Sequence, residues 1–137
     1  MLRRDYVLKL IEQFAKMVGR LLDVDFDNEP VLFCDDFDLL LKEYFKIHPD
    51  HLDLLLTKDE ARDALLLSEN SKNSQLSLFA RAGWVFAKNN DFHRAKICLK
   101  IIERIKRHHA DLFEFPNAES RQTEDEIGKL KEFIGRD

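Results

Sequence analysis

Residues 75–108 of this 137-residue chain have the sequence QLSLFARAGWVFAKNNDFHRAKICLKIIERIKRH. The stretch predicts a helix over residues 75–88 and a second helix over residues 92–108. Between them Asn89, Asn90 and Asp91 form a polar cluster that is typical of a tight turn. Two helices joined by so short a connection pack antiparallel, and we expect this hairpin to organise the fold.

The hairpin resembles a tetratricopeptide repeat (TPR) from Phe79 to Ile105. Gly83 stands at the small position of the first helix, where the family lets the second helix approach closely. The other matching residues are Phe86, Asn90, Asp91, Phe92, Ala95 and Leu99. The chain departs from the family at Ile102, where alanine is preferred, and lacks the closing proline. The resemblance implies stacked helical hairpins and a surface that binds other proteins.

A long amphipathic helix is predicted over residues 5–22, because its apolar side chains fall on one half of the helical wheel. That half contains Tyr6, Val7, Leu10, Ile11, Phe14, Val18, Leu21 and Leu22. The face is wide enough to pack against two neighbours. The polar half carries both charge signs, which argues against a helix lying on a membrane surface.

Between this helix and the hairpin the polarity changes several times. Residues 23–30 predict an acidic loop, and residues 35–47 predict a second helix with one apolar face. Pro49 ends that helix, because proline disfavours the helical conformation in the residue before it, and it opens a short further helix. Residues 69–74 are polar and predict a linker.

Two capping boxes are predicted at helix starts. Thr57 is followed by Glu60, and Thr123 is followed by Glu126, so each threonine is placed to accept a hydrogen bond from a backbone N–H three residues on. The first box begins a short helix and the second begins the last helix of the chain.

These elements predict a single all-α domain over residues 1–137. It contains N-terminal helices in residues 1–68, the TPR-like hairpin in residues 75–108 and a covering helix over residues 123–135. We expect about six or seven helices, stacked as antiparallel hairpins in a short TPR-like array. Four glycines and three prolines are too few for a turn-rich β fold, and no segment alternates like a strand.

Composition restricts the function. The net charge of −4 argues against nucleic acid and anionic membranes as general partners. No apolar run approaches the roughly 20 residues of a membrane-spanning helix. Without an export signal, Cys34 and Cys98 are expected to be reduced thiols in a cytoplasmic protein. Near the N-terminus, Asp5-Tyr6 and Ile11-Glu12-Gln13 resemble the opening of small bacterial helical proteins of unknown function.

No motif predicts catalysis, a cofactor or a metal ion. The acidic residues after position 22 have the alternating spacing of a calcium loop, but Asn28 and Cys34 replace its glycine and glutamate. His48 and His51 have a spacing that suits metal ligands on a helix, but Pro49 interrupts that helix. We therefore expect a protein that is not an enzyme and that acts through its surface.

Two surfaces are candidates for partner binding. The first is Trp84 with Arg81 and Lys88, on the helix side that TPR proteins turn towards their ligands. Here the alternative is that Trp84 packs beneath the N-terminal helices. The second is the basic stripe formed by Lys96, Lys100, Arg104 and Arg107.

The predicted function is a non-enzymatic protein–protein interaction module whose partner is another protein, a peptide or a second copy of the chain. The basic stripe offers a second hypothesis, binding of a polyanion or nucleic acid. It is the weaker one, because no exposed aromatic residues are interleaved to stack on bases. The stripe is also explained by an ordinary solvated face partly neutralised by Glu103.

Overall fold

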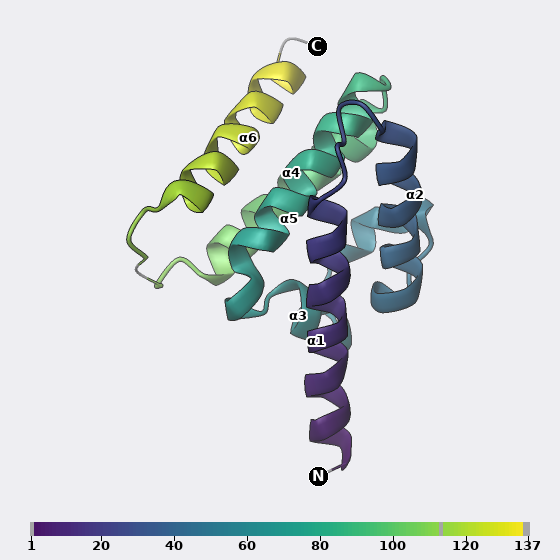
Figure 1. Ribbon diagram of the computed structural model, residues 1–137, viewed down its shortest axis with the longest axis vertical. Helices are drawn as coiled ribbons and strands as arrows, with labels where there is room; N and C mark the ends of the chain where they lie inside the picture. Colours follow the sequence, from purple (N-terminus) through teal and green to yellow (C-terminus); the bar gives the residue numbers. More distant parts are fainter. Residues whose placement is uncertain (1, 113, 136–137) are drawn as a thin grey trace.

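The computed structural model describes residues 2–112 and 114–135, and within them every regular element is a helix (Figure 1). The six α-helices are α1 (Leu2–Leu22), α2 (Pro30–Leu40), α3 (Glu60–Leu66), α4 (Lys72–Lys88), α5 (Phe92–His108) and α6 (Ala118–Gly135). The described residues also form a π-helical turn (Leu41–Phe45) and two 3₁₀ helices (Pro49–Leu56 and Glu69–Ser71). The predicted all-α class is confirmed.

Helices α4 and α5 form the predicted hairpin at the centre of the molecule. Its turn depends on Asn90, whose φ of 64° is left-handed, a conformation that asparagine tolerates better than most residues. Asp91 then caps α5 by accepting a hydrogen bond from the Arg94 backbone N–H at 3.2 Å. The second helix has the predicted bounds, whereas α4 begins at Lys72, within the predicted linker.

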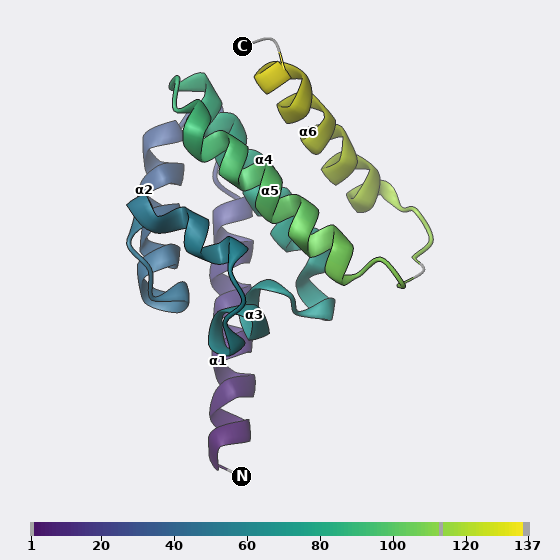
Figure 2. The ribbon, with the colours of Figure 1, turned by 180° about the vertical axis from the view of Figure 1, so that it is seen from behind.

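The remaining helices cover the hairpin from two sides (Figures 1 and 2). On one side α6 lies along the hairpin, and on the other lie α1 and α2. Aromatic rings join the second layer to the hairpin: Phe37 of α2 lies 5.8 Å from Phe79 and 6.0 Å from Phe86 of α4, between ring centroids. The N-terminal end of α1 protrudes from the body (Figure 1).

Gly83 lies where three helices meet. A Cβ atom added there would lie 2.7 Å from Leu130 Cδ2 of α6 and 3.2 Å from Cys98 Cβ of α5. The sequence predicted that Gly83 allows α5 to approach closely. In the structure the nearest neighbour of Gly83 is α6, and α5 is the next nearest.

Helix α2 begins five residues earlier than residues 35–47 predicted, because Pro30 occupies its first turn. Proline suits that position, since its φ is already helical and the missing N–H has no partner there. After Leu40 the chain widens into the π-helical turn, which Lys46 ends with a left-handed φ of 58°.

Both predicted capping boxes are wrong. Asp59, not Thr57, caps α3 by accepting a hydrogen bond from the Arg62 N–H at 2.9 Å, and the Thr57 hydroxyl donates instead to a carbonyl. Asn117 caps α6, with its side-chain oxygen 2.8 Å from the Ser120 N–H. Thr123 is buried inside that helix. In each case a nearby Asp or Asn displaces the threonine, in line with their stronger N-cap preference.

No helix among residues 2–112 and 114–135 combines the length and apolar character needed to cross a membrane.

Candidate protein-binding groove

One face of α4 is left open between α6 and the loop that follows α1. Three adjoining hollows of about 140, 110 and 100 Å³ lie along it. The first two share Arg81 and Glu126, and the last two share Trp84 and Lys129, so they lie side by side, and together we call them the α4 groove. Its floor contains Ser77, Ala80, Arg81 and Trp84, one wall contains Phe26 and Asp27, and the other contains Glu126, Lys129 and Phe133.

Arg81 holds the floor and both walls together. Its Nε donates to Glu126 Oε2 of α6 at 2.7 Å, and its Nη1 donates to the Leu22 carbonyl at the end of α1 at 2.7 Å. The guanidinium carbon lies 5.2 Å from the centre of the Phe26 ring. Arg81 was predicted to bind a partner directly. Two of its five N–H donors are engaged within the chain, so this residue also positions the groove.

Trp84 lies half-buried in the floor. Its Nε1 donates to Asp27 Oδ1 at 3.2 Å, and its ring centroid lies 5.2 Å from that of Phe133. Lys88 Nζ lies 5.2 Å from the Trp84 ring centre and 5.5 Å from that of Phe133. The indole thus packs against α6 and not beneath the N-terminal helices, while part of it borders two of the hollows.

The basic stripe on α5 is interrupted. Lys96, Lys100 and Arg107 are exposed. Arg104, however, forms a bidentate pair with Asp63 of α3, at 2.8 and 2.9 Å. The spacing that placed Arg104 on the stripe is correct for the helix, but its long side chain turns to an acidic residue that only the tertiary fold brings near.

This pair holds Asp63 in its charged form. Burial by itself would raise the pKa of Asp63, but hydrogen bonds from the Arg104 side chain and from the Asp59 backbone, with the nearby guanidinium charges, outweigh it and lower the pKa. The side chains of Arg104 and Asp63 are 17% and 19% exposed, so solvent screens the pair only in part.

Replacing Asp63 with asparagine is expected to reduce the free energy of unfolding by about 2 kcal/mol at neutral pH. Because the folded-state pKa of Asp63 is lowered, its stabilising effect is present above the unfolded pKa and is lost as the pH falls through the folded pKa. Urea unfolding of both proteins from about pH 7 to pH 3 should therefore show the difference shrinking with acid.

The control for this prediction is Glu124→Gln, which breaks a more exposed pair with Lys106. It should cost less than about 1 kcal/mol. Equal losses from the two substitutions, or an Asp63→Asn effect that does not change with pH, would contradict the role assigned to this pair.

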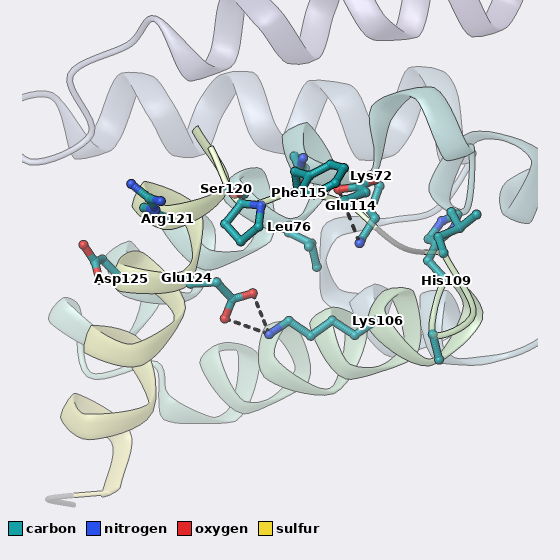
Figure 3. A pocket seen from close by; sticks show the side chains of 14 residues that line it. Lys72, Leu76, Lys106, His109, Glu114, Phe115, Ser120, Arg121, Glu124 and Asp125 are labelled. Atoms are coloured by element: carbon teal, nitrogen blue, oxygen red, sulfur yellow. Dashed lines mark hydrogen bonds and ion pairs between the residues drawn. The ribbon is translucent and has the colours of Figure 1, made fainter. Parts of the chain in front are cut away.

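A larger cavity lies between the start of α4, the end of α5 and the start of α6 (Figure 3). It has a volume of about 520 Å³, and the described residues that border it include equal numbers of cations and carboxylates. Four of these form pairs across it: Lys106 with Glu124 at 2.9 Å, and Lys72 with Glu114 at 3.8 Å.

Among the side chains of this cavity, His109 and Ser120 carry groups suited to general-base or nucleophilic chemistry. His109 is 5% exposed, and burial, followed by the charges of His108 and Lys72, lowers its pKa, which favours the neutral ring. The Ser120 hydroxyl is engaged with the backbone of Asn117 in the cap of α6. Among the described residues no hydrogen bond joins a histidine to this hydroxyl.

The possible metal ligands are also separated. Across the part of the chain that the structure describes, no three His, Cys, Asp or Glu side chains gather where they would hold a metal ion. His48 uses its Nδ1 to accept the Asp50 N–H at 3.1 Å, which caps the 3₁₀ helix. Cys34 and Cys98 are free thiols, and burial raises the pKa of both, so they are protonated at neutral pH.

Comparison with protein-family models, with curated proteins and with solved structures gives no match to this chain. The functional argument therefore depends on geometry and charge.

Proposed function

We propose that this chain is a TPR-like protein–protein interaction module that binds a segment of another protein in the α4 groove, and that it is not an enzyme. The observation that carries the proposal is Trp84, a half-buried indole in the floor of the α4 groove, between α6 and the loop after α1. Tryptophan is enriched among the residues that dominate binding energy at interfaces.

The groove is held in shape before any partner arrives. Arg81 ties α4 to α1 and α6, and the indole N–H of Trp84 is bonded to Asp27. A surface with fixed side chains loses less conformational entropy on binding than a mobile one. This preorganisation supports the groove as a binding surface.

Two alternative partners, a polyanion and a second copy of the chain, have less support. In the basic stripe the Arg104 side chain is paired with Asp63, so three exposed cations remain there, beside the exposed Glu103. For a homodimer the protruding end of α1 offers Tyr6, 67% exposed, and Leu8, 56% exposed. Residues two positions apart in a helix lie on nearly opposite sides of it, so Tyr6 and Leu8 do not form one apolar face. A cytoplasmic location and a bacterial origin stay predictions from the sequence.

The proposal is tested by affinity capture from the native host with four proteins: the wild type, Trp84→Ala, Tyr6→Ala and the double variant Lys96→Glu/Lys100→Glu. Trp84→Ala should reduce recovery of specific partners roughly ten-fold or more. Tyr6→Ala removes an exposed aromatic ring outside the groove and should leave recovery unchanged. Circular dichroism and thermal melts establish that each variant is folded.

Trp84→Phe separates binding from folding, because it keeps a ring against Phe133 and removes only the indole N–H and part of the surface. An intermediate loss is expected. The opposite outcome is unchanged recovery with Trp84→Ala and reduced recovery with Lys96→Glu/Lys100→Glu. That outcome would show that the basic stripe, and not the groove, is the binding surface.

A further inference from the structure

We infer that the segment bound in the α4 groove is basic, with an apolar side chain flanked by lysine or arginine. The inference rests on the proposed function, since it names the chemistry of the partner for the same site. It is carried by the distribution of charge along the two walls.

Among the described residues, the carboxylates that border the hollows are Asp27, Glu119, Glu126 and Glu132, and the cations are Arg81 and Lys129. Arg81 is bonded to Glu126 at 2.7 Å. Lys88 adds one more cation above Trp84. These side chains therefore give the groove a small excess of negative charge, and the neighbouring loop adds to it.

The loop between α1 and α2 forms the acidic wall of the groove, to whose lining it contributes Phe26 and Asp27. The loop contains Asp23, Asp25, Asp27 and Glu29, all exposed, and no lysine or arginine. Hydrogen bonds from Asn28 lower the pKa of Asp25, so that carboxylate stays charged at neutral pH. Four like charges within seven residues repel one another, and a cationic partner would relieve that repulsion.

The groove also has an apolar component. The Trp84 and Phe133 rings lie 5.2 Å apart, and Phe26 stands on the opposite wall. Lys88 already lies over Trp84 and Phe133, so a partner's side chain would contact the part of these rings that Lys88 leaves uncovered. Lysine and arginine can cover such rings with their methylene stems while their charged ends reach carboxylates.

The experiment uses the fluorescence of Trp84, which is the single tryptophan of the chain and therefore reports on the groove alone. Three pools of synthetic peptides of equal length, free of tryptophan and tyrosine, share a central Leu, Met or Phe. Their flanks are Lys/Arg, Asp/Glu or Ser/Gln. Each pool is titrated into the whole protein at about 0.02 M and about 0.5 M salt.

The basic pool is expected to bind roughly ten-fold more tightly than the neutral pool at low salt, with the acidic pool weakest. High salt should narrow this difference several-fold, because it screens exposed charges. Equal binding of the neutral or acidic pool would overturn the inference while leaving the groove as a binding site. No change with any pool would count against the proposed function itself.

A pair of charge variants tests the acidic wall directly. Asp23→Lys/Glu29→Lys reverses two exposed carboxylates of the loop and should weaken the basic pool roughly five-fold to ten-fold. Asp53→Lys/Glu103→Lys makes the same change in net charge at exposed positions outside this loop, on the 3₁₀ helix Pro49–Leu56 and on α5. If both variants weaken binding equally, net charge and not the acidic wall is responsible, and the inference fails.

Discussion

Replacing Phe37 with alanine is expected to lower the free energy of unfolding by about 4 kcal/mol. The ring is fully buried, and it contacts Phe79 and Phe86 of α4 at centroid distances of 5.8 and 6.0 Å. Both contacts are edge-on, the arrangement that aromatic pairs prefer. Truncation removes the ring's buried area and leaves a cavity between α2 and the central hairpin.

Two variants show whether this loss comes from the ring. Phe37→Leu fills most of the volume and should cost only about 1 to 2 kcal/mol. Leu39→Ala, on the same helix at a side chain that is 44% exposed, should cost less than about 1 kcal/mol. Urea unfolding measures all three. Equal losses at positions 37 and 39 would mean that the aromatic contacts do not hold α2 on the hairpin.

Replacing Gly83 with valine is expected to cost about 3 kcal/mol. The new Cβ would lie 2.7 Å from Leu130 Cδ2 and 3.2 Å from Cys98 Cβ, and the two added methyl groups extend further into the same space. The Leu130 side chain has some freedom to move, but the Cβ of Cys98 is attached directly to the backbone of α5. The chain must therefore separate α6 or α5 from α4.

Gly128 provides the matched control, because a Cβ added there meets nothing within 4 Å. Valine has a better helix propensity than glycine, so Gly128→Val should be neutral or slightly stabilising. Thermal melts and urea unfolding compare the two variants. If Gly83→Val is as well tolerated as Gly128→Val, the close approach of three helices at Gly83 is not a requirement of this fold.

The local features of the fold were predictable from sequence. Asn90 at the turn and the bounds of Phe92–His108 follow from the placement of polar and apolar residues along the chain, and the structure confirms them. The caps were predicted wrongly: Asp59 is used instead of Thr57, and Asn117 instead of Thr123. In both cases the cap used is the residue with the stronger N-cap preference, so a ranking of the candidates by residue type would have found it.

For the candidate site, the sequence predicted which residues share one side of α4 but not which groups they contact. Helical spacing placed Arg81, Trp84 and Lys88 on one side of α4, where the groove lies. It did not show that Arg81 is held by Glu126 or that the Trp84 N–H is bonded to Asp27, 57 residues away in sequence. The acidic loop was visible as a composition, without any sign that it forms a wall of this groove.

Amphipathic periodicity is a property of neighbouring residues, and so the sequence by itself determined the amphipathic helices and the central hairpin. The partners of the charged side chains depend on which segments return to the same place after the chain has packed. Only the tertiary structure decided that Asp63 takes Arg104 out of the basic stripe and that Glu126 and Leu22 fix Arg81. A charged side chain is directed by the nearest compensating group in space, and sequence spacing does not record that group.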